Sequence, residues 1–203
     1  MMFEQIHSNL SLLTAKFDSI PDKRKDLLET IANYIRSKKD KNEAINLMFV
    51  CTHNSRRSHF GQIAAALAAD FYGIKNVHVF SGGTEATAFN PNAIKAVEQF
   101  GLKTKKISDG SNPHYEIYFS DNNKTICFSK VYNDEFNPNK NFAAIMTCGD
   151  AEENCPFIPG VELRIATTYE DPKRSDGTPL QEQTYLERFK QIATEVLYAF
   201  SKI

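Results

Sequence analysis

Apolar residues in the first part of the chain recur at intervals of three and four, which is the spacing of one face of an α-helix. The first series is Phe3, Ile6, Leu10, Leu13 and Phe17. A second follows Pro21, a residue that suits the first turn of a helix. Its members are Leu27, Leu28, Ile31, Tyr34 and Ile35. We predict an N-terminal helical hairpin that packs on the main domain; dimerisation or docking is the alternative.

A polar stretch at residues 37–42 predicts a linker, and after it the pattern alternates between apolar strands and longer helical segments. Strands are predicted at residues 45–50, 76–80, 143–147 and 161–165, and helices at 58–72, 91–100 and 180–201. Such alternation is typical of parallel sheets with right-handed crossovers. We therefore predict an N-terminal extension at residues 1–42 and an α/β domain at residues 43–203. The domain is expected to be a three-layer sandwich around a mostly parallel four-stranded sheet.

Residues 115–132 interrupt this rhythm. Tyr115, Ile117 and Phe119 alternate with polar residues, a turn at residues 121–123 follows, and alternation then resumes as far as Tyr132. This pattern predicts a β-hairpin inserted into the α/β domain. Cys127 falls in its second strand, where we interpret it as a packing residue.

Composition narrows the functional classes. The chain has 203 residues, a formal net charge of −1 and four cysteines. This charge gives no general attraction to nucleic acid or to an anionic membrane. No apolar run reaches the ~20 residues of a membrane span, and residues 1–17 lack the features of a signal peptide. We expect a cytoplasmic protein, in which cysteines are more often redox-active, catalytic or metal-binding than structural.

The segment from Cys51 to Ser58 joins the first strand of the domain to a helix. Helix N-termini carry unpaired N–H groups and favour negative charge, so a tetrahedral oxyanion is expected to bind here. The same field favours the thiolate form of Cys51, which is the nucleophilic form. Arg57 can bind two oxyanion oxygens, and Ser58 can donate to the sulfur. The remaining loop residues are Thr52, His53, Asn54, Ser55 and Arg56. The alternative is a buried cysteine followed by a solvated basic turn.

Cys148 and Cys155 form a second group, separated by a polar and acidic stretch. Cys148 directly follows a predicted strand. A zinc site is disfavoured because the segment holds no histidine and the spacing is not that of a zinc knuckle. Two readings stay open: a pair of unrelated buried thiols, and a redox pair on a mobile loop.

Together these residues resemble the low-molecular-weight protein tyrosine phosphatase superfamily. The signature is Cys51, five residues, Arg57 and Ser58, and the added Cys148 and Cys155 are similar to its thioredoxin-coupled arsenate reductase branch. Residues 80–83, 90–94 and 170–172 also match. The resemblance covers residues 45–203 apart from the inserted hairpin, and the N-terminal hairpin lies outside the family pattern.

The resemblance implies a division of roles. Cys51 attacks the arsenic of arsenate bound in the loop, with Arg57 as its main cation, and Asp171 is the general acid that protonates the leaving oxygen. Cys148 then attacks the Cys51 adduct and releases arsenite, and Cys155 attacks Cys148. Thioredoxin or a similar dithiol reduces the final disulfide, with no tightly bound cofactor. From the residues alone, Asp171 follows the last strand and can reach a ligand at the same edge of the sheet.

The chain departs from the family at three places. His53 stands where a glycine is usual, and Arg56 where reductases often carry a cysteine. Some family reductases hold potassium through an asparagine, a glutamate, a serine and an aspartate. The matching positions here are Asn54, Gln62, Ser81 and Asp109. The loss of the glutamate charge at position 62 weakens the expectation of a potassium site.

Two other functions are weighed against arsenate reduction. A phosphatase acting on phosphotyrosine or another phosphomonoester needs only Cys51, Arg57 and Asp171, with water resolving a Cys51 phosphocysteine. Lys173 and Arg174 follow the Asp-Pro pair, where phosphatases often carry tyrosines. The cysteine pair favours the reductase, with an oxyanion and a thioredoxin-like protein as partners. A non-catalytic anion sensor on the same fold is the third possibility.

Overall fold

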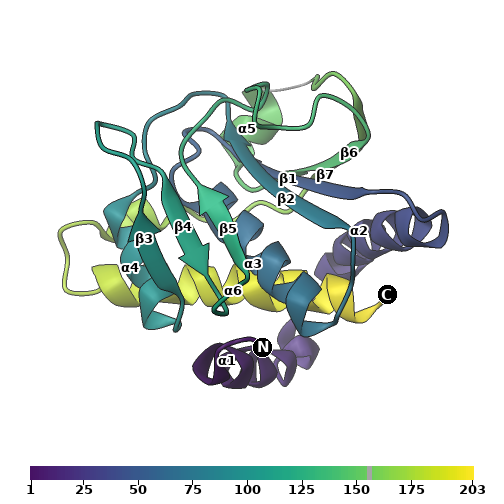
Figure 1. The fold of residues 1–203 in the computed structure, drawn as a ribbon, viewed down its shortest axis with the longest axis horizontal. Helices are drawn as coiled ribbons and strands as arrows, with labels where there is room; N and C mark the ends of the chain where they lie inside the picture. Colours follow the sequence, from purple (N-terminus) through teal and green to yellow (C-terminus); the bar gives the residue numbers. More distant parts are fainter. Residues whose placement is uncertain (155–156) are drawn as a thin grey trace.

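A four-stranded parallel sheet lies at the centre of the computed structural model, which describes residues 1–154 and 157–203 (Figure 1). The strand order is β2-β1-β6-β7. The bounds are Ile45–Cys51 for β1, Val77–Gly83 for β2, Phe142–Met146 for β6 and Val161–Ala166 for β7. Every pair within this sheet is parallel. The predicted α/β class and the four-stranded sheet are thus confirmed.

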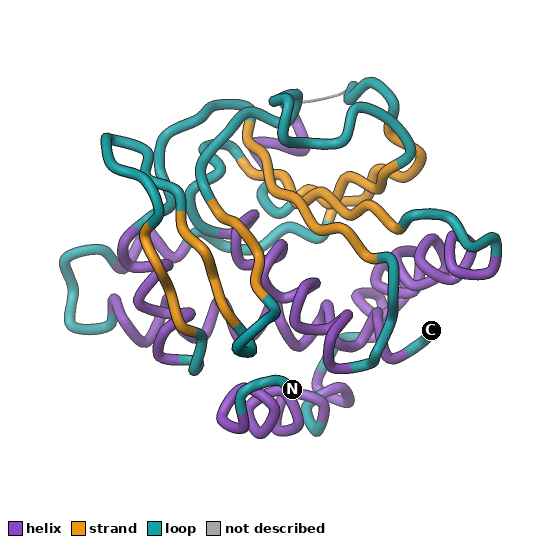
Figure 2. The backbone as a smooth tube through the Cα atoms, viewed as in Figure 1, coloured by secondary structure: helices purple, strands orange, loops and turns teal. Residues whose placement is uncertain are grey.

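Helices cover the two faces of the sheet unequally (Figure 2). One face is covered by the helices α2 (Asp22–Asp40), α3 (Arg57–Phe71), α4 (Pro91–Gln99) and α6 (Gln181–Ser201). They share one apolar core with Leu47 and Phe49 of β1. The alternate residues Met48 and Val50 face the other side, where α5 (Gly149–Asn154) and the segment around Ile158 cover them. The sheet is therefore the middle of three layers.

The acidic stretch after Cys148, expected to be a loop, forms helix α5 instead. Asp150 and Glu152 lie in its first turn, where carboxylates favour a helix. Glu152 also pairs with Arg164 of β7 at 2.8 Å. Residues 149–154 are thus helical and not the loop that one of the two open readings assumed, and the rest of that stretch, with Cys155, lies outside the described residues.

A second, antiparallel sheet stands beside the first, with the order β3-β4-β5. Its strands are Lys103–Lys106, Tyr115–Tyr118 and Lys124–Cys127. Strands β4 and β5 are the predicted hairpin. Strand β3 was missed because its sequence, Lys-Thr-Lys-Lys, has no apolar alternation; lysine-rich strands suit the edge of a sheet. Cys127 is fully buried, and burial raises the pKa of its thiol to about 12.

The N-terminal helices α1 (Glu4–Thr14) and α2 both pack against α6. A short 3-10 helix, η1 (Phe17–Ser19), lies between them. Helix α2 continues to Asp40, so the predicted linker is wrong for residues 37–40. The reason is Lys38, which is buried and pairs with Glu43 at 2.7 Å and with Glu162 of β7 at 2.8 Å. Neither the sequence spacing nor the charge pattern revealed these partners.

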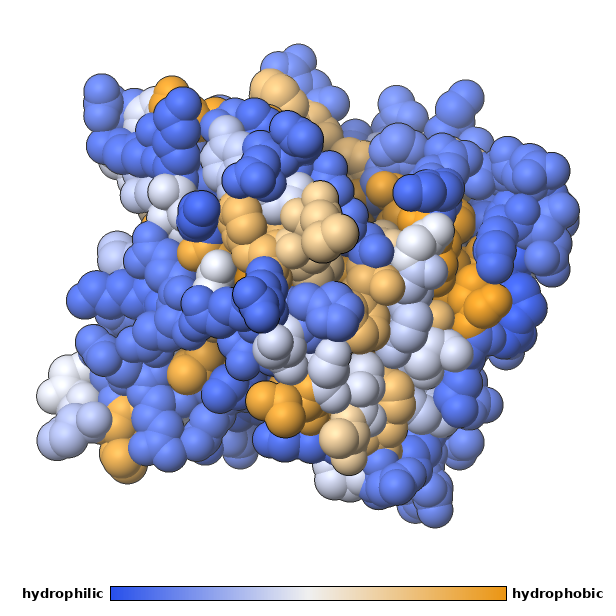
Figure 3. Space-filling model, turned by 60° about the horizontal axis from the view of Figure 1, so that its bottom comes forward, coloured by the Kyte–Doolittle hydropathy of each residue, from blue (hydrophilic) through white to orange (hydrophobic). Residues whose placement is uncertain are grey.

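The surface shown in Figure 3 is mainly hydrophilic, with apolar side chains gathered toward its middle. None of the helices in the described part of the chain is both long and apolar enough to cross a membrane.

If α1 is an integral part of the core, truncating its buried leucine must lower the stability of the whole domain. Leu10 is 0% exposed and Leu12, on the same helix, is 65% exposed. We expect Leu10→Ala to lower the free energy of unfolding by about 2–5 kcal/mol. Leu12→Ala, the matched control, should change it by less than about 0.5 kcal/mol. Urea denaturation followed by circular dichroism measures both, and equal small effects would show that α1 contributes little to folding.

Candidate active site

The motif loop, residues 52–56, leaves the carboxyl end of β1 and enters the N-terminus of α3. Cys51 is the last residue of β1 and is buried. The N-cap residue Arg56 makes no side-chain capping bond to α3. The first N–H groups of the helix therefore remain available to an anion beside the Cys51 sulfur. Arg56 and Arg57 are the two residues before Ser58, and Arg57 is the first residue of the helix.

A chain of hydrogen bonds ends at the Cys51 sulfur. The main-chain N–H of Lys130 donates to Asn54 Oδ1 at 2.8 Å, which orients the Asn54 amide so that its Nδ2 faces Ser58. Asn54 Nδ2 then donates to Ser58 Oγ at 2.8 Å. The Ser58 hydroxyl, having accepted that bond, has its own proton free for Cys51 Sγ at 3.0 Å. The series therefore places a hydroxyl donor beside the sulfur of the predicted nucleophile.

The loop requires one left-handed residue, and it is Asn54, with φ of 43°. Asparagine adopts this conformation more readily than most residues. His53, which replaces the glycine usual in the family, does not have positive φ. Its side chain instead lies 3.7 Å from Glu85, at the rim of the loop. The substitution at position 53 therefore causes no backbone strain.

Arg57 is held by the segment that carries the predicted acid. Its NH2 group donates to Asp171 Oδ2 at 2.7 Å and its NH1 group to the Tyr169 carbonyl at 2.8 Å. Asp171 Oδ1 accepts from the Lys173 N–H at 3.0 Å, which caps the 3-10 helix η2 (Pro172–Ser175). An oxyanion that binds in the loop must compete with Asp171 for the Arg57 guanidinium.

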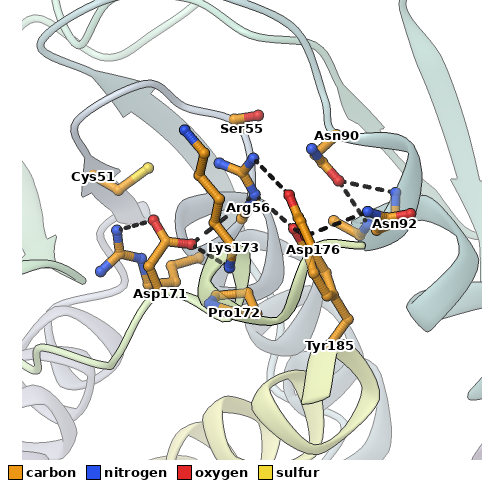
Figure 4. Close-up of polar contacts among 12 residues, drawn as sticks. Cys51, Ser55, Arg56, Asn90, Asn92, Asp171, Pro172, Lys173, Asp176 and Tyr185 are labelled. Atoms are coloured by element: carbon orange, nitrogen blue, oxygen red, sulfur yellow. Dashed lines mark hydrogen bonds and ion pairs between the residues drawn. The ribbon is translucent and has the colours of Figure 1, made fainter. Parts of the chain in front are cut away.

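Arg56 was expected either to add positive charge to the anion site or to point to solvent. Its side chain is 13% exposed, so it does not point to solvent. Arg56 Nε donates to the Tyr185 hydroxyl of α6 at 2.9 Å, and its NH2 group lies 3.9 Å from Asp176. Figure 4 shows this guanidinium directed at Tyr185 and Asp176. Sequence reasoning missed both partners, since nothing in their local pattern marks them as part of a site.

Cys148 lies beside the motif loop. It follows β6, which pairs with β1, and Thr147 donates to the Val50 carbonyl through both its N–H and its hydroxyl. Cys148 is 1% exposed, and its Sγ lies 3.4 Å from Thr52 Oγ1. Cys51 and Cys148 are both free thiols. The structure thus brings the first two predicted cysteines to one region.

Segments on both sides fix the backbone of the loop. Ser55 Oγ donates to the Ala88 carbonyl at 2.7 Å, and Ser129 Oγ donates to the His53 carbonyl at 2.9 Å. Gly83 at the end of β2 packs so closely that a Cβ there would lie 2.6 Å from the Thr52 carbonyl oxygen. The loop is therefore positioned by contacts with backbone atoms, which cannot move aside easily.

Two of the four residues considered for potassium, Gln62 and Asp109, have protein partners. Asp109 is exposed and pairs with Lys106 at 2.8 Å. Gln62 donates its amide to Thr125 and to the Ile126 carbonyl. Asn54 and Ser81 are buried behind the loop. Among the described residues, no group of three or more His, Cys, Asp or Glu side chains could hold a metal ion.

A buried lysine supplies positive charge behind the loop. Burial lowers the pKa of Lys130 to about 8. His59, also buried, has its pKa held well below the usual value, first by burial and then by Lys130. Its Nδ1 contacts Ser81 Oγ at 3.2 Å, so His59 is a neutral structural residue here. Lys130 and Gln62 also line a groove of about 710 Å³ between β2 and β5, which Cys51, Arg57 and Asp171 do not line.

Comparison with known proteins places the chain in a family, although no family model matches it. The arsenate reductase of Bacillus subtilis strain 168 is 31% identical over 146 residues, which cover 71% of this chain and 86% of that protein. The arsenate reductase of Oceanobacillus iheyensis is 29% identical over 157 residues, covering 77% and 94%. The chain belongs to the arsenate reductase family of these proteins.

The solved structures agree on the fold. Primo-1 superposes with a TM-score of 0.51 at 13% identity, covering 76% of this chain and 95% of that one. The resemblance predicted from Cys51, Arg57 and the two later cysteines is thereby confirmed at the level of family. For this member of the reductase branch, the roles of the individual residues remain predictions.

Gly83 gives a direct test of the loop packing. In Gly83→Ala the new Cβ would lie 2.4 Å from the Glu85 carbonyl oxygen and 2.7 Å from the Asn54 nitrogen, so the loop must shift. We expect inorganic phosphate, used as an arsenate analogue, to bind about tenfold more weakly by calorimetry. The control is Gly149→Ala, where nothing lies within 4 Å of the new Cβ. Unchanged binding in both variants would show that Gly83 does not position the loop.

The lowered pKa of Lys130 predicts that the stability of the protein depends on pH in an unusual way. Its folded pKa of about 8 lies below the ordinary 10.5, so between these values the unfolded chain holds more protons. Stability must therefore rise with pH in this window, by at most about 1.4 kcal/mol per unit. We expect the free energy of unfolding of the wild type to increase relative to that of Lys130→Met between pH 8 and 9.5. Lys75→Met, which removes an exposed lysine of the same groove, is the control. Equal slopes in wild type and Lys130→Met would contradict the assignment.

Proposed function

We propose that this protein is a thiol-dependent arsenate reductase whose nucleophile is Cys51. The observation that supports this most is the 3.4 Å contact of Cys148 Sγ with Thr52 Oγ1, which keeps a second thiol beside the nucleophile loop. A phosphatase resolves its covalent intermediate with water and has no need of that sulfur. The names of the two reductases that resemble the chain support the same proposal.

In the first step of the proposed reaction, arsenate binds at the N-terminus of α3 and takes over donors of Arg57 from Asp171. The Cys51 thiolate attacks arsenic and forms an S–As bond. The bond from arsenic to the opposite hydroxyl group breaks, and Asp171 acts as the general acid that protonates this hydroxyl, so that water leaves. Ser58 holds the thiolate before attack through its 3.0 Å contact with the sulfur.

The second step reduces arsenic. The Cys148 thiolate attacks the Cys51 sulfur and forms a disulfide. The electron pair of the broken S–As bond stays on arsenic, which passes from arsenate to arsenite and departs. Cys51 and Cys148 are both buried, so this exchange is shielded from bulk water.

The third step restores the nucleophile. The Cys155 thiolate attacks Cys148, which frees Cys51 as a thiolate and leaves a Cys148–Cys155 disulfide. A thioredoxin-like dithiol then reduces that disulfide and supplies the two electrons of the cycle. Because the three thiols must be reduced at the start of each turnover, a cytoplasmic location is part of the proposal.

A phosphatase is the second candidate, because Cys51, Arg57 and Asp171 also suffice for phosphomonoester hydrolysis. In that reaction water, instead of Cys148, attacks the covalent Cys51 intermediate. The two functions therefore differ in their need for Cys148, which lies outside the oxyanion loop in the sequence.

Turnover of purified protein with arsenate, thioredoxin, thioredoxin reductase and NADPH separates the two. We expect arsenate-dependent NADPH oxidation that disappears in both Cys51→Ser and Cys148→Ser, because each breaks the relay before a reducible disulfide forms. Cys127→Ser is the matched control, since that buried thiol lies outside the relay. Absence of oxidation in the wild type, with p-nitrophenyl phosphate hydrolysis that is indifferent to Cys148→Ser, would assign the protein to the phosphatases.

A further inference from the structure

Arg56 belongs to the oxyanion loop by sequence but to the acid segment by contact. Its Nε donates to the Tyr185 hydroxyl at 2.9 Å and lies 4.0 Å from Asp171 Oδ1, and its NH2 group lies 3.9 Å from Asp176 Oδ2. Both carboxylates thus share this one guanidinium. Neither the anion-binding role nor the solvent-exposed role expected from the sequence describes these contacts.

Tyr185 holds the guanidinium group of Arg56 in place. Its side chain is fully buried on α6, where a phenol needs hydrogen-bond partners. The hydroxyl accepts from Arg56 and donates to Asp176 Oδ1 at 2.8 Å. Asp176 also receives a longer bond of 3.5 Å from Asn92 at the start of α4. The contacts join the motif loop, the acid segment, α4 and α6 at one point (Figure 4).

The acid segment is held at both of its ends by this arrangement. Asp171 and Asp176 flank the 3-10 helix η2 as its two cap residues. Arg57 forms an ion pair with Asp171, whereas Arg56 lies within 4.0 Å of both carboxylates. Without Arg56, Asp171 would keep the guanidinium of Arg57 and the N–H of Lys173, and the charge of Asp176 would lose its guanidinium partner. Asp171 would then compete more strongly with an oxyanion for Arg57.

We propose that Arg56 is a positioning residue that holds the segment from Asp171 to Asp176 against the oxyanion loop and so limits the competition of Asp171 for Arg57. It acts through Asp171 and not by binding the oxyanion. The proposal deepens the proposed function, because Asp171 is the acid of that reaction. Its central test is a binding measurement, so its failure is distinguishable from a failure of arsenate turnover.

A double-mutant cycle with inorganic phosphate as the probe tests the proposal. By calorimetry we expect Arg56→Gln to weaken phosphate binding by about tenfold in the wild-type background and by less than about threefold in the Asp171→Asn background. A purely structural loosening, or direct anion binding by Arg56, would produce the same loss in both backgrounds and would overturn the proposal. No loss in either background would also overturn it.

Three further variants strengthen the double-mutant cycle. Tyr185→Phe keeps the charge of Arg56 but removes the hydroxyl to which Arg56 donates. It should therefore also weaken phosphate binding. Arg174→Gln is the matched control, because it removes a cation from the same segment that pairs with Glu170 instead. It should leave phosphate binding unchanged. If Arg56→Gln does not fold, Arg56→Lys keeps the charge without the planar fork, and the same dependence on Asp171 must appear.

Turnover adds a second readout once arsenate reduction is observed. Because the acid protonates the leaving oxygen, Arg56→Gln should lower kcat as well as raise KM for arsenate. A rise of KM alone, with kcat unchanged, would indicate that Arg56 binds substrate without positioning Asp171.

Discussion

The nucleophile loop depends on one hydrogen bond from a distant segment. Lys130 presents its main-chain N–H to Asn54, and that bond decides which way the asparagine amide faces. The amide then orients the Ser58 hydroxyl, and this hydroxyl directs its proton toward the Cys51 sulfur. A main-chain donor cannot be exchanged for an acceptor by rotation, unlike a hydroxyl or an amide. The direction of the whole series is therefore set by the backbone beyond β5, outside the motif that a sequence search would highlight.

The charged side chains of the site already pair with one another before an oxyanion binds. Two carboxylates, Asp171 and Asp176, are matched by the guanidinium groups of Arg56 and Arg57. Binding an anion exchanges one of these internal pairs for an external one, so the free energy gained is a difference between two similar interactions. Such an exchange favours a small, highly charged oxyanion that can bind Arg57 with two oxygens at once.

The sequence predicted those features whose cause is local. The alternation of apolar strands and helices and the position of Cys51 between a strand and a helix were sufficient for the fold class and for the nucleophile loop. Strand β3 escaped because an edge strand of lysines has no apolar pattern. The end of α2 was placed too early because the partners of Lys38 are distant in sequence. Arg56 was misjudged for the same reason, as Tyr185 lies 129 positions away. Periodicity and motifs were thus sufficient to predict local features, whereas polar pairs between residues distant in sequence became visible only in the three-dimensional structure.

Helix α6 contacts α1, α2, α3 and α4, and it also contributes Tyr185. On a ribosome, this helix is made after every one of those partners. The apolar faces of α1 and α2 are therefore completely covered only after α6 has been translated. Burial of these faces cannot follow the order of synthesis strictly. During synthesis it presents an incomplete core, and that is the interval in which a nascent-chain chaperone has a surface to hold.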